Sequence, residues 1–183
     1  GADNSGHYVT MSGGNVSTHT YDTTGDLGLA TSGATTTHDA GGTAIAVACD
    51  VRDPQQVETA LAQTVEKFGR LDIVVNGAAG NFIALAEQLS PNGFGTVIDI
   101  DLKGTFNVSR AAYPHLKVRG GVVLNISATL QLLGTIGQSH AAAAKAGIDS
   151  LTKTLAAEWG RHHINVNAIA PGFFPSKMTR GVL

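Results

Sequence analysis

The sequence predicts an α/β domain built on a mostly parallel, buried sheet. Two observations support this fold class: after residue 42, short apolar runs alternate with stretches of helical periodicity, and the apolar runs are continuous enough for buried strands. The composition agrees, because 183 residues with 43% hydrophobic and 14% charged side chains suit one domain with a substantial core.

The first 42 residues differ from the rest of the chain. They are rich in Gly, Thr and Ser and contain no Lys or Arg, the first basic residue being Arg52. Such a segment buries little apolar surface. Within it, residues 7–11 followed by residues 12–14 resemble a remnant strand and turn, whereas residues 15–24 lack the apolar stripe of a helix. We therefore divide the chain into an atypical segment, 1–42, and a core, 43–183.

The elements of the core follow in order. A buried strand is expected at residues 43–49. Asp53 and Pro54 then supply an N-cap and a first-turn proline for a helix whose apolar stripe runs from Val57 to Phe68. Alternating apolar runs and periodic stretches predict the remaining elements: strands at 71–75, 121–126 and 163–170, and helices at 91–117 and 140–159.

Charge and hydropathy narrow the classes of partner. A net charge of −2 without a basic cluster argues against nucleic acid or an anionic membrane surface. No apolar run reaches the roughly 20 residues that a membrane span needs, so we expect a cytoplasmic protein with a small-molecule ligand. His7, His19, His38 and His115 lack the spacing of metal ligands, so no metal site is expected.

Small and polar residues follow each predicted strand of the core. In an open parallel sheet, ligands bind outside the carboxyl ends of the strands, so these residues are the candidates for a site. They occur in four groups: Asp50 and Val51, residues 76–82, residues 127–129, and Pro171 with Gly172. Each group alone is typical of a tight turn. It is the order and spacing of the four groups together that indicate a binding site.

In that order and spacing the chain, from about residue 43 to residue 172, resembles the short-chain dehydrogenase/reductase family. The resemblance implies a Rossmann-like doubly wound parallel sheet with three layers, incomplete at both ends, and NADP or NAD as cofactor. It further implies the following roles: Asp50 accepts a hydrogen bond from the adenine amino group, Val51 lies beside the adenine ring, Asn76 and Ala78 allow the backbone to approach the ribose and phosphates, Lys145 holds the nicotinamide ribose, and Pro171 and Gly172 line the nicotinamide pocket.

The chain departs from the family where carbonyl reduction needs an acid. The family's tyrosine, four residues before Lys145, is Ala141 here, and the family's serine is Ala128. Local strings resemble the peroxisomal type of 2,4-dienoyl-CoA reductase, which dispenses with that tyrosine. By this resemblance Asp101 and Lys145 act through a water as proton source, while Asn125 or backbone N–H groups stabilise the thioester oxygen. Hydride transfer from NAD(P)H to an unsaturated acyl-CoA is the predicted reaction.

The two ends of the chain leave alternatives open. The glycine motif that binds a pyrophosphate is not found in the first 42 residues, and only eleven residues follow Gly172. A degenerate, non-redox scaffold is one alternative. The other is a serine hydrolase using Ser139, with His162, His163 and Asp149 downstream. Helices 91–117 and 140–159 predict a homodimer or homotetramer by the same resemblance.

Overall fold

The computed structural model describes residues 7–12, 15–20, 45, 47 and 49–172. It consists of five strands, β1 (His7–Ser12), β2 (Asn15–Thr20), β3 (Ile73–Asn76), β4 (Gly121–Ile126) and β5 (Ile164–Ile169), and of the helices α2 (Pro54–Phe68), α3 (Pro91–Val97), η1 (Ile98–Lys103), α4 (Gly104–Leu116), α5 (Leu130–Leu133), α6 (Ser139–Trp159) and η2 (Gly160–His162). No helix in these ranges is long and apolar enough to cross a membrane.

One sheet contains all five strands in the order β2-β1-β3-β4-β5. The strands β3, β4 and β5 are parallel, which confirms the predicted parallel core of the sheet. The hairpin β1–β2 adds to it antiparallel to β3, so the sheet is mixed at that edge. The predicted strand at 43–49 is wrong for the residues described there, because Ile45, Val47 and Cys49 are not in a strand.

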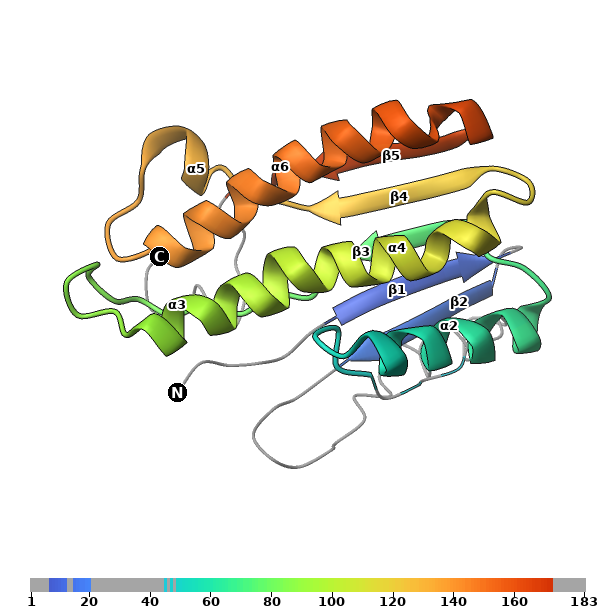
Figure 1. The fold of residues 1–183 in the computed structure, drawn as a ribbon, viewed down its shortest axis with the longest axis horizontal. Coiled ribbons are helices and arrows are strands. Elements are labelled where there is room, and N and C mark those ends of the chain that lie inside the picture. The colour runs from blue at the N-terminus through green and yellow to red at the C-terminus, as the bar shows by residue number, and fades with distance from the viewer. Residues whose placement is uncertain (1–6, 13–14, 21–44, 46, 48, 173–183) are drawn as a thin grey trace.

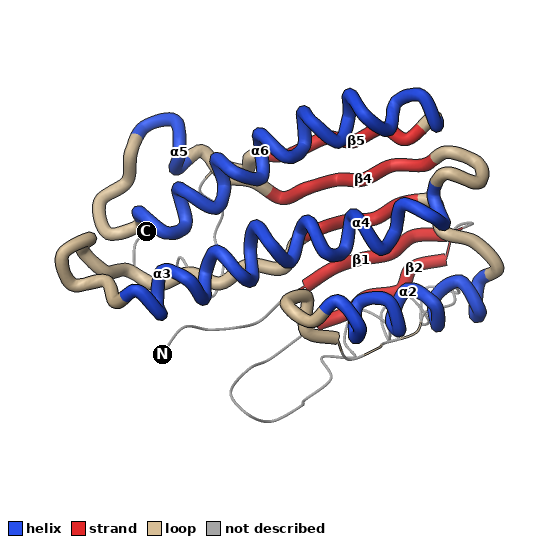
Figure 2. Tube along the Cα trace, in the orientation of Figure 1, coloured by secondary structure: helices blue, strands red, loops and turns tan. Residues whose placement is uncertain are grey.

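The helices α2, α4 and α6 lie in front of the sheet in Figure 1, and Figure 2 shows the same view with the helices in blue and the strands in red. Buried residues alternate along β3 and β4, where Val74 and Val123 are fully buried and their sequence neighbours are only partly so. The buried positions join the helix layer in one core with Val57, Leu61 and Leu116. The third predicted layer has no helix among the described residues.

The long predicted helix at 91–117 forms with a change of helix type in its middle. Between α3 and α4 the backbone follows the wider π-helix η1, in which the Gly104 N–H donates to the Asp99 carbonyl five residues earlier. Such π turns are rare in proteins, and those that do occur are often found at functional sites. The turn carries Asp101, which is 1% exposed.

Local sequence explains where the other helices begin. The Asp53 side chain accepts hydrogen bonds from the Gln55 and Gln56 N–H groups, and Pro54 occupies the first turn of α2, as predicted. α6 begins at Ser139, one residue before the prediction, and ends at Trp159 as predicted. β4 has the predicted bounds, and β3 and β5 fall within two residues of theirs at each end.

Candidate active site

An ion pair between Asp101 of η1 and Lys145 of α6 lies at the centre of the site. The Lys145 Nζ is 3.2 Å from Asp101 Oδ2, and it also donates a 3.0 Å hydrogen bond to the Ile126 carbonyl at the end of β4. Both side chains are largely buried: the Lys145 side chain is 10% exposed and the Asp101 side chain is 2% exposed. Gly147 permits this close approach of α6 to η1, because a Cβ there would lie 2.6 Å from a Leu102 methyl group.

Burial determines the direction in which the pKa of the Asp101 carboxyl is shifted. Burial raises the pKa of Asp101 above its usual value, and the Lys145 charge together with the Gly80 N–H offsets only part of that rise. The Gly80 N–H donates to Asp101 Oδ1 at 2.7 Å. The carboxyl therefore keeps a proton to a higher pH than an exposed aspartate does, which suits a group that takes part in proton transfer.

A buried amide network fixes the ends of β3 and β4. The Asn76 Nδ2 donates to Asn125 Oδ1 at 2.8 Å and to Ser109 Oγ at 2.9 Å, and the Asn125 Nδ2 donates to Thr152 Oγ1 at 2.8 Å. Asn125 is 0% exposed and Asn76 is 5% exposed. The network thus ties the two strands to α4 and α6, and the Asn125 amide is directed to protein groups. Sequence reasoning identified the two asparagines and missed Ser109 and Thr152, whose helical positions gave no motif.

Two polar side chains near the ion pair have no hydrogen-bond partner in the described structure. Ser127, which follows β4, is 3% exposed and its Oγ is unpaired. His140, in the first turn of α6, is 0% exposed and both ring nitrogens are unpaired. Its ring packs on Phe82, with the centroids 4.5 Å apart. Buried polar atoms are normally bonded, so these two side chains stand out among the buried polar groups of the site. No role was predicted for His140 from the sequence.

Asp50 and Val51 lie just before α2. The Asp50 carboxylate accepts from the Arg52 backbone N–H at 2.9 Å and pairs with the Arg52 guanidinium at 2.5 Å. Partial burial acts to raise the pKa of Asp50, but the hydrogen bonds and charge of Arg52 outweigh it and lower the pKa. Val51 is 3% exposed and lies against Gly104, where a Cβ would meet Val51 Cγ2 at 2.5 Å.

The remaining predicted cofactor residues differ in exposure. Ala78 is 8% exposed in the loop after β3, whereas Pro171 and Gly172 are exposed after β5. All follow carboxyl ends of the parallel strands, as expected. Within the described part of the chain, no group of three or more His, Cys, Asp or Glu side chains could hold a metal ion.

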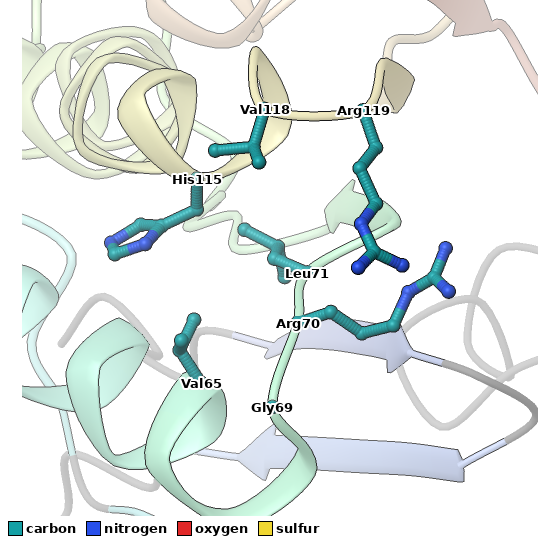
Figure 3. A pocket seen from close by; sticks show the side chains of 7 residues that line it. All are labelled: Val65, Gly69, Arg70, Leu71, His115, Val118 and Arg119. Carbon is teal, nitrogen blue, oxygen red and sulfur yellow. The ribbon is translucent and has the colours of Figure 1, made fainter.

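A cavity of about 160 Å³ lies at the opposite end of the strands (Figure 3). It is found between the ends of α2 and α4 and the residues that lead into β3, and it is lined by Val65, Gly69, Arg70, Leu71, His115, Val118 and Arg119. None of the residues assigned to the cofactor or the reaction lines this cavity, which lies before the start of β3. It is therefore not part of the strand-end site.

The hydrolase alternative lacks its structural context. A nucleophile elbow places the serine between a strand and a helix. Ser139 begins α6, but the element before it is the short helix α5 followed by a turn. His162 lies beyond the far end of α6, about 30 Å along a helix of this length. The Asp149 carboxylate accepts from Gln131 Nε2. The predicted triad is not assembled.

Comparison with known proteins identifies the relatives of this fold. Residues 21–182 match the short chain dehydrogenase family. The peroxisomal 2,4-dienoyl-CoA reductase of Rattus norvegicus, named as (3E)-enoyl-CoA-producing, is 52% identical over 124 residues, which are 67% of this chain and 42% of that protein. A probable 2,4-dienoyl-CoA reductase of Bacillus subtilis, named as (2E)-enoyl-CoA-producing, is 49% identical over 74% of this chain and 55% of its own length.

Solved structures of short-chain dehydrogenases are also similar to this chain. A short chain dehydrogenase from Bacillus anthracis superposes with a TM-score of 0.68 at 47% identity, covering 72% of this chain and 54% of that one. A putative short-chain alcohol dehydrogenase from Sinorhizobium meliloti gives a TM-score of 0.78 at 32% identity, covering 81% and 60% of the two chains. The chain thus spans about half the length of the relatives that it matches.

Proposed function

The chain belongs to the short chain dehydrogenase family, and on that premise we propose that it takes part in the NAD(P)H-dependent reduction of a 2,4-dienoyl-CoA. The observation that carries the proposal is the buried pair of Asp101 and Lys145 at 3.2 Å, beside the ends of β3 and β4. Relatives at about 50% identity are named as 2,4-dienoyl-CoA reductases, which supports the same substrate class.

The described residues fit the adenine and a ribose of a nicotinamide nucleotide. Asp50 is kept ionised by Arg52, so it can accept from an adenine amino group, and the Val51 side chain is held in place against Gly104. Small residues after β3, among them Ala78 and Gly80, leave room for backbone to approach a ribose. Bound there, the nucleotide supplies the hydride. The choice between NADP and NAD stays open in this proposal.

The proposed chemistry follows from the missing tyrosine. Ala141 occupies its position on α6 and is 2% exposed, so no hydroxyl acid is present there for reducing a ketone. Adding hydride to the remote end of a conjugated dienoyl thioester needs no such acid, because it yields a dienolate that takes up a proton at carbon. The raised pKa of the Asp101 carboxyl suits it to supply that proton through a water, with Lys145 orienting both.

Asn125 has a positioning role in this proposal, in place of direct donation to the thioester oxygen. Its amide bonds Asn76 and Thr152 and has no exposed surface. It holds the end of β4, which presents the Ile126 carbonyl to Lys145. The oxyanion then takes donors from the backbone N–H groups of the strand-end loops, as preorganised dipoles of this kind do in other acyl chemistry.

The assembly and location of the protein stay predictions. A homodimer or homotetramer through residues 91–117 and 140–159 is compatible with two exposed aromatic side chains in the first of these ranges, Phe94 of α3 at 39% and Phe106 of α4 at 44%. The rat relative is named as peroxisomal, while the sequence by itself predicts a cytoplasmic protein. An acyl-CoA is the proposed small-molecule partner.

Calorimetric titration with NADPH and with NADH tests the proposal. We expect one of the nucleotides to bind and Lys145→Ala to weaken that binding about tenfold or more, since a charged hydrogen bond contributes about 1.5–3 kcal/mol. Lys153→Ala, which removes an exposed lysine on the same helix, is the matched control. If neither nucleotide binds, the reductase proposal fails and the non-redox scaffold is favoured.

A further inference from the structure

The cavity that lies before β3 has an apolar part. It is formed by Val65 in the last turn of α2, Leu71 just before β3, and Val118 just after α4. Leu71 is 4% exposed and belongs to the core, whereas Val118 is 73% exposed although it is apolar. The volume of about 160 Å³ suits an apolar body of about the size of a benzene ring, since an engineered cavity of about 150 Å³ binds benzene.

The same cavity has a positively charged side. Figure 3 shows the guanidinium groups of Arg70 and Arg119 pointing toward one another on one side of the cavity, away from His115. The Arg70 Nε donates to Asp72 Oδ1 at 2.7 Å, so Asp72 balances the charge of Arg70. Among the described residues that line the cavity, none is acidic. Two like charges therefore face one another with a single negative charge between them and solvent, which leaves one positive charge for a ligand to balance.

The helix ends beside the cavity do not use the Arg119 side chain. A basic side chain near a helix C-terminus often bonds the last carbonyls of that helix. At the end of α2 the Gly69 N–H donates to the Val65 carbonyl at 2.7 Å, and at the end of α4 the Gly120 N–H donates to the Leu116 carbonyl at 2.9 Å. In the described structure the Arg119 guanidinium forms no hydrogen bond or ion pair. Its N–H donors are thus available to an acceptor in the cavity.

We propose that this cavity binds a small monocarboxylate with an apolar body. The carboxylate lies between Arg70 and Arg119, because a guanidinium donates two parallel hydrogen bonds to a carboxylate. The apolar body covers Val65, Leu71 and Val118. Inorganic phosphate lacks such a body, and an acyl-CoA is too large for about 160 Å³. The proposed site is separate from the strand-end site and does not depend on the reductase function.

Hexanoate is a suitable probe, because it carries one negative charge and a short apolar chain. The 183-residue chain is labelled with ¹⁵N-arginine and titrated with sodium hexanoate. The Nε resonances of Arg70 and Arg119 are identified by their loss in Arg70→Gln and Arg119→Gln. We expect both resonances to shift with one dissociation constant of about 1 mM or lower. Acetate should bind at least about tenfold more weakly, since each buried methylene changes the affinity about fourfold.

Variants and a neutral ligand separate this site from general ion binding. Arg119→Gln should weaken hexanoate binding, followed at the Arg70 resonance, about tenfold or more, the effect of losing a charged hydrogen bond. Arg119 is exposed, so its replacement leaves the fold intact. Arg110→Gln, which replaces another exposed arginine on α4, is the matched control and should bind hexanoate as the wild type does. Hexanamide, which has the same chain without the charge, should shift neither resonance.

Three results would overturn the proposal. The first is that hexanoate leaves both arginine resonances unmoved, which is also the result expected if it binds only at the strand-end site. The second is that acetate binds as tightly as hexanoate, which would show a plain anion contact without an apolar part. The third is that Arg119→Gln binds hexanoate as tightly as the wild type. Because binding is measured and not turnover, a protein without reductase activity would refute the proposed function and leave this test unaffected.

Discussion

Asp101→Asn separates the electrostatic role of the carboxyl from its shape. The asparagine has the same size, and its Oδ1 can still accept from the Gly80 N–H. Lys145 loses its counter-charge but keeps the Ile126 carbonyl as an acceptor and 10% of its side chain in contact with solvent. The substitution therefore removes one buried charge and replaces the acceptor that faces Lys145 by an amide N–H2, which cannot pair with the ammonium.

The expected effect on stability follows from the direction of the Asp101 pKa. A pKa raised in the folded protein means that the carboxyl stabilises the fold fully below the ordinary value of 3.8 and that this contribution is lost as the pH rises through the folded value. At neutral pH the carboxylate is thus a net cost. We expect Asp101→Asn to lower the free energy of unfolding at pH 7 by less than the about 3–5 kcal/mol that breaking a net-stabilising buried pair costs.

Catalysis should respond more strongly than stability. An amide cannot supply the proton, so kcat should fall by about 10²–10⁴-fold, the usual contribution of a general acid. Urea unfolding at pH 5 and pH 7 and steady-state kinetics measure the two effects. Asp99→Asn is the control, since Asp99 belongs to the same π-helix but forms a 3.5 Å pair at its surface. A loss of several kcal/mol in Asp101→Asn, or an unchanged kcat, would refute this reasoning.

Two further substitutions test the framework of the site. Asn125→Ala should cost about 1–3 kcal/mol in urea unfolding, because it leaves buried groups of Asn76 and Thr152 without their partner; an unchanged unfolding midpoint would contradict the amide network. Gly104→Ala should cost about 1–3 kcal/mol and weaken nucleotide binding in calorimetry, because its Cβ would meet Val51 Cγ2 at 2.5 Å; wild-type binding and stability would show that Val51 does not need this contact.

Much of the fold could be predicted because its signals are local. Apolar runs of strand length identified β3, β4 and β5, and Asp53 followed by Pro54 marked the start of α2. The parallel order of the strands also placed Asn76 and Asn125, the polar residues at the ends of β3 and β4, at one edge, because the carboxyl ends of parallel strands meet at the same side of a sheet. Asp101 and Lys145 lie on helices and were predicted only from the resemblance to the short-chain dehydrogenase/reductase family.

The rest depends on contacts between distant residues. The apolar run at 43–49 has the composition of a strand, but residues 45, 47 and 49 do not join the sheet, where β1 pairs with β3 instead. The π turn at Asp101 leaves no mark in the periodicity of residues 91–117. Asn125 was expected to face the substrate, yet its partner Thr152 comes from α6, and such side-chain pairing is decided by packing.

The central claim is tested most directly by the reaction itself. A 2,4-dienoyl-CoA is incubated with NADPH and the purified protein, and nucleotide oxidation is followed together with the masses of the acyl-CoA products. The account predicts nucleotide oxidation that depends on the dienoyl-CoA, a product heavier by two hydrogens, and loss of both in Lys145→Ala. Absence of turnover with NADPH and with NADH, or turnover that Lys145→Ala leaves unchanged, would contradict it.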